Sequence, residues 1–267
     1  MKQADKKYIE KEVVEFLGDK IPEKETKNKY CGFETMGVKL LSPLSSSSYP
    51  NWVNAAYLST FITWNETGDD VVSQEKSFEE KEKRLLDMLK SRPISVATEC
   101  VKFTFAMENV SRAVTHQIVR HRKMAFGQQS LRVSDPAEDY IRLPQVLYDG
   151  DYSFPEGMMD MTQDVLDGVK RLYANLVKSG VPREQARAVL PIGICTKINA
   201  TMSLRAMIEY FRARTSDIAM AEHTHLVALM AQEMMDQQYR FYNFLCSQVN
   251  GLDDIRKEYL HETMQPV

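Results

Sequence analysis

Five basic side chains stand between Glu108 and Asp135 with no Asp or Glu among them. They are Arg112, Arg120, Arg122, Lys123 and Arg132. Like charges placed this closely repel one another, so the stretch predicts a fold that gathers them around an anion. Guanidinium groups suit phosphate in particular, because their planar fork donates two parallel hydrogen bonds. The alternative is a solvated basic face, the commoner fate of an arbitrary basic run.

The first half of this stretch has the periodicity of a helix. Asn109 is a favoured N-cap residue and is expected to begin a helix over residues 110–121. Apolar side chains recur every four residues and predict its buried stripe: Val110, Val114 and Ile118. Gln117, Arg120 and His121 stand three and four residues apart, so they share a second face of that helix.

The second half alternates as a β-strand does. Gln128, Ser130 and Arg132 alternate with Gln129 and Leu131, which places the first three on one side of an extended segment. One helix end and one strand would then present amide, guanidinium, imidazole and hydroxyl groups together. The pattern predicts a polyanion site with hydrogen-bonding selectivity.

These residues resemble the signature of the flavin-dependent thymidylate synthases, often called ThyX. In that signature Arg-His-Arg is followed after seven residues by a serine, as Arg120-His121-Arg122 is followed by Ser130. Other blocks resemble the family in the same order: Phe103-Thr104-Phe105, residues 111–117, residues 186–191, residues 201–205 and Arg214. The resemblance runs over roughly residues 37 to 240. Ordered blocks are far more specific than a lone Arg-His-Arg.

The resemblance implies an enzyme with a defined chemistry. Its members methylate carbon 5 of deoxyuridylate (dUMP) to give thymidylate. Methylene-tetrahydrofolate supplies the carbon, and FAD reduced by NADPH supplies the hydride. The family also implies a homotetramer whose active site is shared between subunits, with a small-molecule nucleotide rather than nucleic acid as its partner.

The resemblance also implies roles for individual residues. Arg214 is the expected catalytic residue, because the matching arginine pairs with the uracil ring; a helix-end arginine is the alternative. The residues expected to bind the nucleotide are Gln117, Arg120, Gln128, Gln129, Ser130, Leu131, Arg132 and Arg187. Those expected to bind FAD are Arg120, His121, Arg122, Gln128, Ser203, Arg205 and Glu209. Ser130 is interpreted as a nucleotide ligand rather than a nucleophile.

The chain departs from the family pattern mainly on the flavin and folate side. Ser203 replaces an asparagine, Glu209 replaces Asn or His, and residues 92–100 contain no histidine where the family has one. Two other interpretations therefore stay open. One is a paralogue that methylates or hydroxymethylates another pyrimidine nucleotide, such as uridylate; the other is a nucleotide-binding protein that has lost catalysis.

Net charge, hydropathy and cysteine content indicate the environment in which the chain works. The net charge of −3 and pI of about 6.0 give no global attraction to nucleic acid. No apolar run approaches the roughly 20 residues of a membrane helix, and the N-terminus does not resemble a signal peptide. Four scattered cysteines without a Cys-x-x-Cys pair predict reduced thiols, no metal site and a cytoplasmic protein. His223 and His225 are expected on a surface or subunit contact, and His116 in a structural hydrogen bond.

The fold expected is α/β (α+β): one domain with a twisted, mainly antiparallel sheet flanked by long helices. Residues 1–30 are expected to be a peripheral helix and linker, and residues 31–267 the catalytic domain. Strands are expected over residues 38–41, 99–107 and 194–202. Helices are expected over residues 51–64, 77–90, 158–178, 203–214 and 217–250. Ser77 to Glu80 has the spacing of a capping box.

Overall fold

The computed structural model describes residues 30–42, 56–57, 77–91, 96–136, 140–143, 157–216 and 218–262. Residues 1–29 of the predicted N-terminal helix and linker lie outside these residues, as does most of the helix predicted over residues 51–64.

A four-stranded antiparallel sheet forms the centre of the fold, in the order β2-β3-β6-β4. Its strands are β2 (Gly37–Ser42), β3 (Lys102–Ser111), β4 (Met124–Gln128) and β6 (Cys195–Ser203). Two short strands, β1 (Tyr30–Cys31) and β5 (Ile141–Arg142), pair in parallel beside it. The expected mixed fold with a mainly antiparallel sheet is confirmed.

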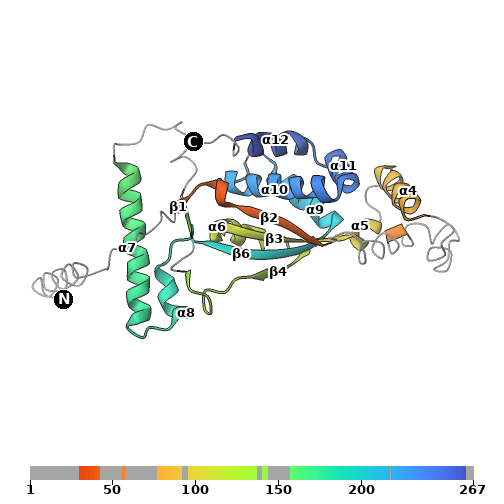
Figure 1. Ribbon diagram of the computed structural model, residues 1–267. Helices are drawn as coiled ribbons and strands as arrows, with labels where there is room; N and C mark the ends of the chain where they lie inside the picture. Colours follow the sequence, from red (N-terminus) through yellow and green to blue (C-terminus); the bar gives the residue numbers. More distant parts are fainter. Residues whose placement is uncertain are drawn as a thin grey trace, which may run out of the picture.

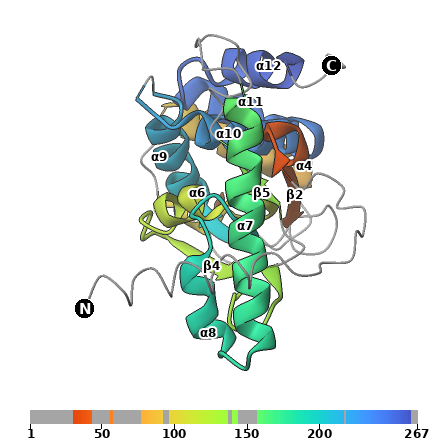
Figure 2. The ribbon, with the colours of Figure 1, turned by 90° about the vertical axis from the view of Figure 1, so that its left-hand side faces the viewer.

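Helices make up most of the remaining described structure. In chain order they are η1 (Phe33–Thr35), α4 (Phe78–Ser91), α5 (Ala97–Cys100), α6 (Arg112–Ile118), α7 (Met158–Lys178), α8 (Arg183–Ala186), η5 (Arg187–Val189), α9 (Leu204–Arg214), α10 (Ala221–Gln237), α11 (Tyr239–Gln248) and α12 (Leu252–Glu262). Helices α9 to α12 lie on one face of the sheet (Figure 1). Helix α7 stands across one end of it, with α8 beside it (Figures 1 and 2).

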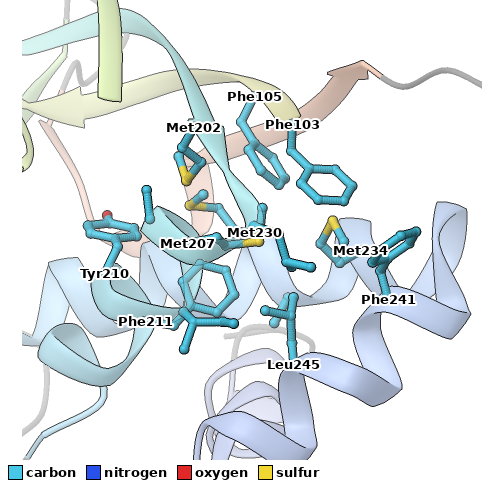
Figure 3. Close-up of a cluster of buried hydrophobic side chains, with 14 of the residues drawn as sticks. Phe103, Phe105, Met202, Met207, Tyr210, Phe211, Met230, Met234, Phe241 and Leu245 are labelled. Atoms are coloured by element: carbon cyan, nitrogen blue, oxygen red, sulfur yellow. The ribbon is translucent and has the colours of Figure 1, made fainter. Parts of the chain in front are cut away.

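The core lies between the sheet and helices α9 to α11. Alternation on β3 turns Phe103 and Phe105 towards it, and both are fully buried. They meet methionines and aromatic rings from the covering helices, with Tyr210 at the edge of the cluster (Figure 3). Burial of large apolar side chains, worth about 1.5–3 kcal/mol each, is the main force that holds the helices on this face.

The other face of the sheet carries small and polar side chains. Thr104 on β3 faces Thr201 on β6, and their hydroxyls lie 2.9 Å apart. Asn199 and Lys102 on the same face are exposed. None of the described helices covers this face (Figure 1).

The elements predicted from local sequence patterns agree with the structure. Ser77 and Glu80 form the predicted capping box: each side chain accepts from the other's backbone N–H, at 2.9 and 3.2 Å. Helix α7 has the predicted bounds, and Gly180 follows it with a φ of +87°. Strands β2 and β6 and helix α9 also fall within a residue or so of their predicted ranges.

Three predicted elements are wrong in their bounds. Asn109 does not cap α6; it lies in β3 with a φ of +53°, and Ser111 is the cap. Strand β3 begins at Lys102 rather than residue 99, because the short helix α5 precedes it. The long helix predicted over residues 217–250 is two helices separated at Gln238, whose φ of −139° is not helical.

The predicted strand from Gln128 to Arg132 is also wrong. Strand β4 ends at Gln128, and a turn follows in which Ser130 O accepts from Val133 N at 3.1 Å. The Ser130 hydroxyl accepts from Arg132 N at 3.2 Å, so a local side-chain bond competes with the sheet ladder. Gln128, Ser130 and Arg132 therefore do not share one face of a strand.

Candidate active site

Helix α6 is fixed at its start by a buried polar network. The Ser111 hydroxyl accepts from Val114 N and donates to Glu222 Oε2 at 2.7 Å. Glu222 Oε1 accepts from Ser111 N at 2.8 Å and lies 3.5 Å from Arg142 Nε. The side chains of Arg142 and Glu222 are 4% and 7% exposed, so this ion pair is nearly removed from water. The network ties α6 to α10 and β5.

The other end of α6 meets the end of α9. Arg214 donates from Nη1 to Gln117 Oε1 at 3.2 Å, and from Nη2 and Nε to His121 Nε2 at 3.1 and 3.3 Å. All three side chains are half-buried. We call Gln117, His121 and Arg214 the guanidinium cluster. The predicted catalytic arginine thus lies against Gln117 of α6 and His121 in the turn that follows it.

The guanidinium cluster holds a positive charge between neutral acceptors. Burial, then the neighbouring Arg214, lowers the pKa of His121, so its imidazole is neutral at physiological pH. Because Arg214 can only donate, His121 Nε2 must carry the lone pair and Nδ1 the proton. No ion pair joins Arg214 to a carboxylate among the described residues. Its charge is available to an anion.

A second cluster surrounds Glu184 at the start of α8. Arg132 Nη2 lies 2.6 Å from Glu184 Oε2, and Arg187 Nε donates to Glu184 O at 3.2 Å. The neighbouring Ser130 is exposed. Ser130, Arg132 and Pro182 to Glu184 line an open hollow of about 500 Å³. We call Ser130, Arg132, Glu184 and Arg187 the loop cluster; it unites three of the predicted nucleotide ligands.

A third cluster lies along α9, on the predicted flavin side. Glu209 accepts from Lys123 Nζ at 2.8 Å and from Arg205 Nε at 3.4 Å. Arg205 also lies 3.5 Å from Glu99, which accepts from the Ser203 hydroxyl at 2.8 Å. The hydrogen bond from Lys123 is the main reason that the pKa of Glu209 is lowered, so this carboxylate is ionised. We call Glu99, Lys123, Ser203, Arg205 and Glu209 the flavin-side cluster.

The remaining predicted ligands lie outside these three clusters. Gln128 donates to Thr115 Oγ1 at 3.0 Å, and Gln129 Oε1 accepts from Lys197 N at 3.3 Å. Leu131 is buried, so it can shape the site only through packing or its backbone. Arg120 and Arg122 are exposed in the turn after α6, with no ion pair to any described residue.

The structure corrects the expectation that the basic run lacks acids. Lys123 and Arg132 are paired with Glu209 and Glu184, which come from 86 and 52 residues further along the chain. Sequence spacing carries no signal for such distant partners. Fewer cations therefore lack a carboxylate partner among the described residues than the sequence suggests. Arg120, Arg122 and Arg214 are among those that do.

Two histidines lie elsewhere than predicted. His223 and His225 are 0% and 2% exposed, so they are core residues and not surface residues. Their burial lowers the pKa of His223 to about 3 and that of His225 to about 4. His116, expected in a structural hydrogen bond, is exposed on α6. Within the described ranges, no group of His, Cys, Asp and Glu could hold a metal ion.

Comparison with known families gives a match over the part of the chain that contains these clusters. A family model described as thymidylate synthase complementing protein matches residues 47–238, which include all three clusters. The chain belongs to this family.

Curated relatives in the thymidylate synthase complementing protein family carry a consistent name. The flavin-dependent thymidylate synthase of Clostridium tetani is 33% identical over 213 residues, covering 75% of this chain and 84% of the relative. That of Geobacter sulfurreducens is 35% identical over 150 residues, covering 56% of this chain and 62% of the relative. That of Nitratidesulfovibrio vulgaris is 40% identical over 120 residues, covering 43% and 49%. The chain thus spans about half to four fifths of the length of these relatives.

The family's signature residues divide among the clusters. Gln117 and Arg214 are in the guanidinium cluster, whereas Arg132 and Arg187 are in the loop cluster. None of the hydrogen bonds or ion pairs between described residues joins these two clusters. Glu209 of the flavin-side cluster is close enough to act electrostatically on His121. Within the described part of the chain, no helix has the length and apolar character that crossing a membrane requires.

Proposed function

We propose that this chain is a flavin-dependent thymidylate synthase that methylates dUMP at carbon 5. Methylene-tetrahydrofolate is the carbon donor, and NADPH reduces the bound flavin. The names of the relatives and the family match support the proposal. Consumption of NADPH and a nucleotide is consistent with a location in the cytoplasm.

The guanidinium cluster is the observation that carries the proposal. Gln117 and His121 each accept from Arg214, and both are neutral, so they orient the guanidinium without cancelling its charge. Each terminal nitrogen of Arg214 keeps a second N–H for a ligand. A donor fixed in this way stabilises the anion that develops on the uracil imide more than it stabilises the neutral ring.

The described residues fit an anionic cofactor such as FAD. Arg120 and Arg122 are exposed and suit its phosphates. Glu209 would repel those phosphates on its own, but Lys123 and Arg205 offset its charge. We infer that Arg120, His121, Arg122, Ser203 and Arg205 hold FAD, which when reduced supplies the hydride.

Anaerobic turnover tests the proposal directly. The purified chain is expected to show oxidised-flavin absorption and, with methylene-tetrahydrofolate, NADPH and dUMP, to form a product with the mass of thymidylate. Uridylate in place of dUMP tests the paralogue interpretation in the same assay. Flavin binding with neither nucleotide converted would contradict the proposal.

Arg132, a member of the loop cluster, is expected to bind the phosphate of the nucleotide. Its ion pair with Glu184 is 63% and 47% exposed, so water screens it and a phosphate can compete for the guanidinium. Arg132→Ala should weaken dUMP binding by about 1.5–3 kcal/mol, and Arg132→Lys should restore only part of it. Calorimetric titration measures both. Unchanged binding in Arg132→Ala would remove the loop from the site.

We further propose that four copies assemble, so that the loop cluster of one subunit faces the guanidinium cluster of another. The absence of any hydrogen bond or ion pair between the two clusters among the described residues supports this. So do the sheet face that none of the described helices covers and the exposed apolar stripe of α7, where Met161, Val165 and Leu172 are 57%, 61% and 41% exposed.

Light scattering should therefore give a mass of about four times 30.7 kDa. Val165→Asp places a charge in the apolar stripe of α7 and is expected to shift the distribution to smaller species. The amount of flavin bound per chain should decrease as the fraction of chains in tetramers decreases. A stable monomer that binds FAD tightly would contradict the shared site.

A further inference from the structure

A buried tyrosine and histidine lie directly behind the guanidinium cluster. Tyr210 is one helical turn before Arg214 on α9, and His223 is in the first turn of α10. The Tyr210 hydroxyl and His223 Nε2 are 2.8 Å apart, and the two side chains are 1% and 0% exposed. Burial raises the pKa of Tyr210 and lowers that of His223, so both are neutral. The contact is a hydrogen bond between uncharged groups inside the core.

The Tyr210 ring is also in contact with His121. The ring centroids are 4.9 Å apart and the ring planes meet at 86°, an edge-to-face arrangement. Such a contact limits rotation of the imidazole. Because His121 must keep Nε2 towards Arg214, the ring that packs against it also fixes which nitrogen Arg214 meets.

The first turn of α10 holds the backbone of Arg214 as well. The Thr224 hydroxyl donates to Arg214 O at 3.0 Å, and Thr224 follows His223 in the chain. Adjacent residues of α10 thus reach Tyr210 through a side chain and Arg214 through the backbone. The end of α9 is fixed from behind at both points.

We propose that Tyr210 and His223 are positioning residues that set the orientation of His121 and, through it, the direction of the Arg214 guanidinium. The kinetic consequence of this inference rests on the proposed thymidylate synthase function. The orientation itself does not.

Packing alone does not account for this pair. His223 Nδ1 is buried and has no hydrogen-bond partner among the described residues. An unsatisfied buried polar atom destabilises the folded state, whereas an apolar side chain of similar size would fill the space without that penalty. The folded state with this polar pair is therefore less stable than it would be with an apolar pair of similar size. We infer that the pair instead controls the orientation of His121.

Tyr210→Phe removes only the hydroxyl and keeps the ring. We expect turnover to fall about tenfold to a hundredfold, as misplacement of a catalytic group does, with little change in the KM for dUMP. Tyr242→Phe is the matched control, because it also removes a buried hydroxyl with a partner, Asp253, but lies away from the clusters. Similar turnover losses in both variants would overturn the inference.

Histidine nitrogen chemical shifts test the orientation without any turnover. In the wild-type chain His121 should show the proton on Nδ1, and in Tyr210→Phe a mixture of both tautomers. An unchanged His121 signal in Tyr210→Phe would overturn the inference. Should the wild-type chain form no thymidylate, the proposed function fails, while this spectrum still decides the positioning role.

Two substitutions of His223 complete the test. His223→Gln keeps a polar group that can hydrogen-bond the Tyr210 hydroxyl, and it should recover most of the turnover and the His121 tautomer. His223→Leu fills the space without such a group and should behave like Tyr210→Phe. Equal activity in His223→Gln and His223→Leu would show that the hydrogen bond has no positioning role.

Discussion

Arg214→Ala is expected to reduce thymidylate formation about a hundred- to a thousandfold, the usual cost of losing one preorganised donor. The guanidinium is held by Gln117 and His121 before any ligand arrives, so no reorganisation is needed when charge develops on the uracil ring. The loss should appear mainly in turnover and less in dUMP affinity, because the interaction strengthens in the transition state.

Flavin reduction and product formation, measured on the same variant, distinguish a catalytic role of Arg214 from a structural one. Arg214→Ala should still bind flavin and accept electrons from NADPH, yet form almost no product. Arg212→Ala is the matched control: Arg212 is also in the last turn of α9, but donates to Gln248 O at 2.7 Å outside the clusters. If Arg214 were only a helix-end arginine, both variants would lose at most about 1 kcal/mol of stability and keep normal turnover.

Local signals in the sequence are sufficient for much of the fold. The capping box at Ser77 and Glu80 needs only residues three apart, and it is present as predicted. Helix α7 is amphipathic over its whole length and ends before Gly180, whose φ of +87° suits glycine. The alternation of apolar residues along β3 also predicts its buried face, because it depends only on residues close together in the chain. Each of these features is decided within a few residues.

Features that depend on distant partners could not be predicted in this way. Ser111 rather than Asn109 caps α6, in a network with Glu222, which is 111 residues further along. His223 is buried with its ring hydrogen-bonded to the Tyr210 hydroxyl, and no local pattern shows that pairing. The turn after Gln128 replaces a strand because Ser130 bonds its own neighbours. In each case a polar side chain decides the structure through a contact that periodicity does not encode.

The candidate site was predictable in its members but not in its arrangement. The resemblance to the family names Gln117, His121 and Arg214, and the structure brings them together. The acids that offset Lys123 and Arg132 come from α9 and α8, so the charge left for a ligand is smaller than the basic run implies. Charge compensation is a property of the folded chain, and only the structure shows it.

Glu222→Ala is expected to lower the free energy of unfolding by about 3–5 kcal/mol, the cost of breaking a buried ion pair from one side. The substitution removes the carboxylate that lies beside Arg142 and that accepts from both the amide and the hydroxyl of Ser111. Urea unfolding at a fixed protomer concentration, with an unchanged slope against denaturant, measures the loss.

Two comparisons identify the cause of that loss. Asp87→Ala breaks an ion pair with Lys90 that is 61% and 56% exposed, and it should change stability by less than about 1 kcal/mol. Glu222→Gln keeps an acceptor for Ser111 N but removes the charge, so it should fall between wild type and Glu222→Ala. Replacing both partners, as Arg142→Met with Glu222→Leu, should recover part of the stability, because no buried charge is then left behind. A Glu222→Ala chain as stable as Asp87→Ala would show that the pair and its bonds to Ser111 do not hold α6 in place.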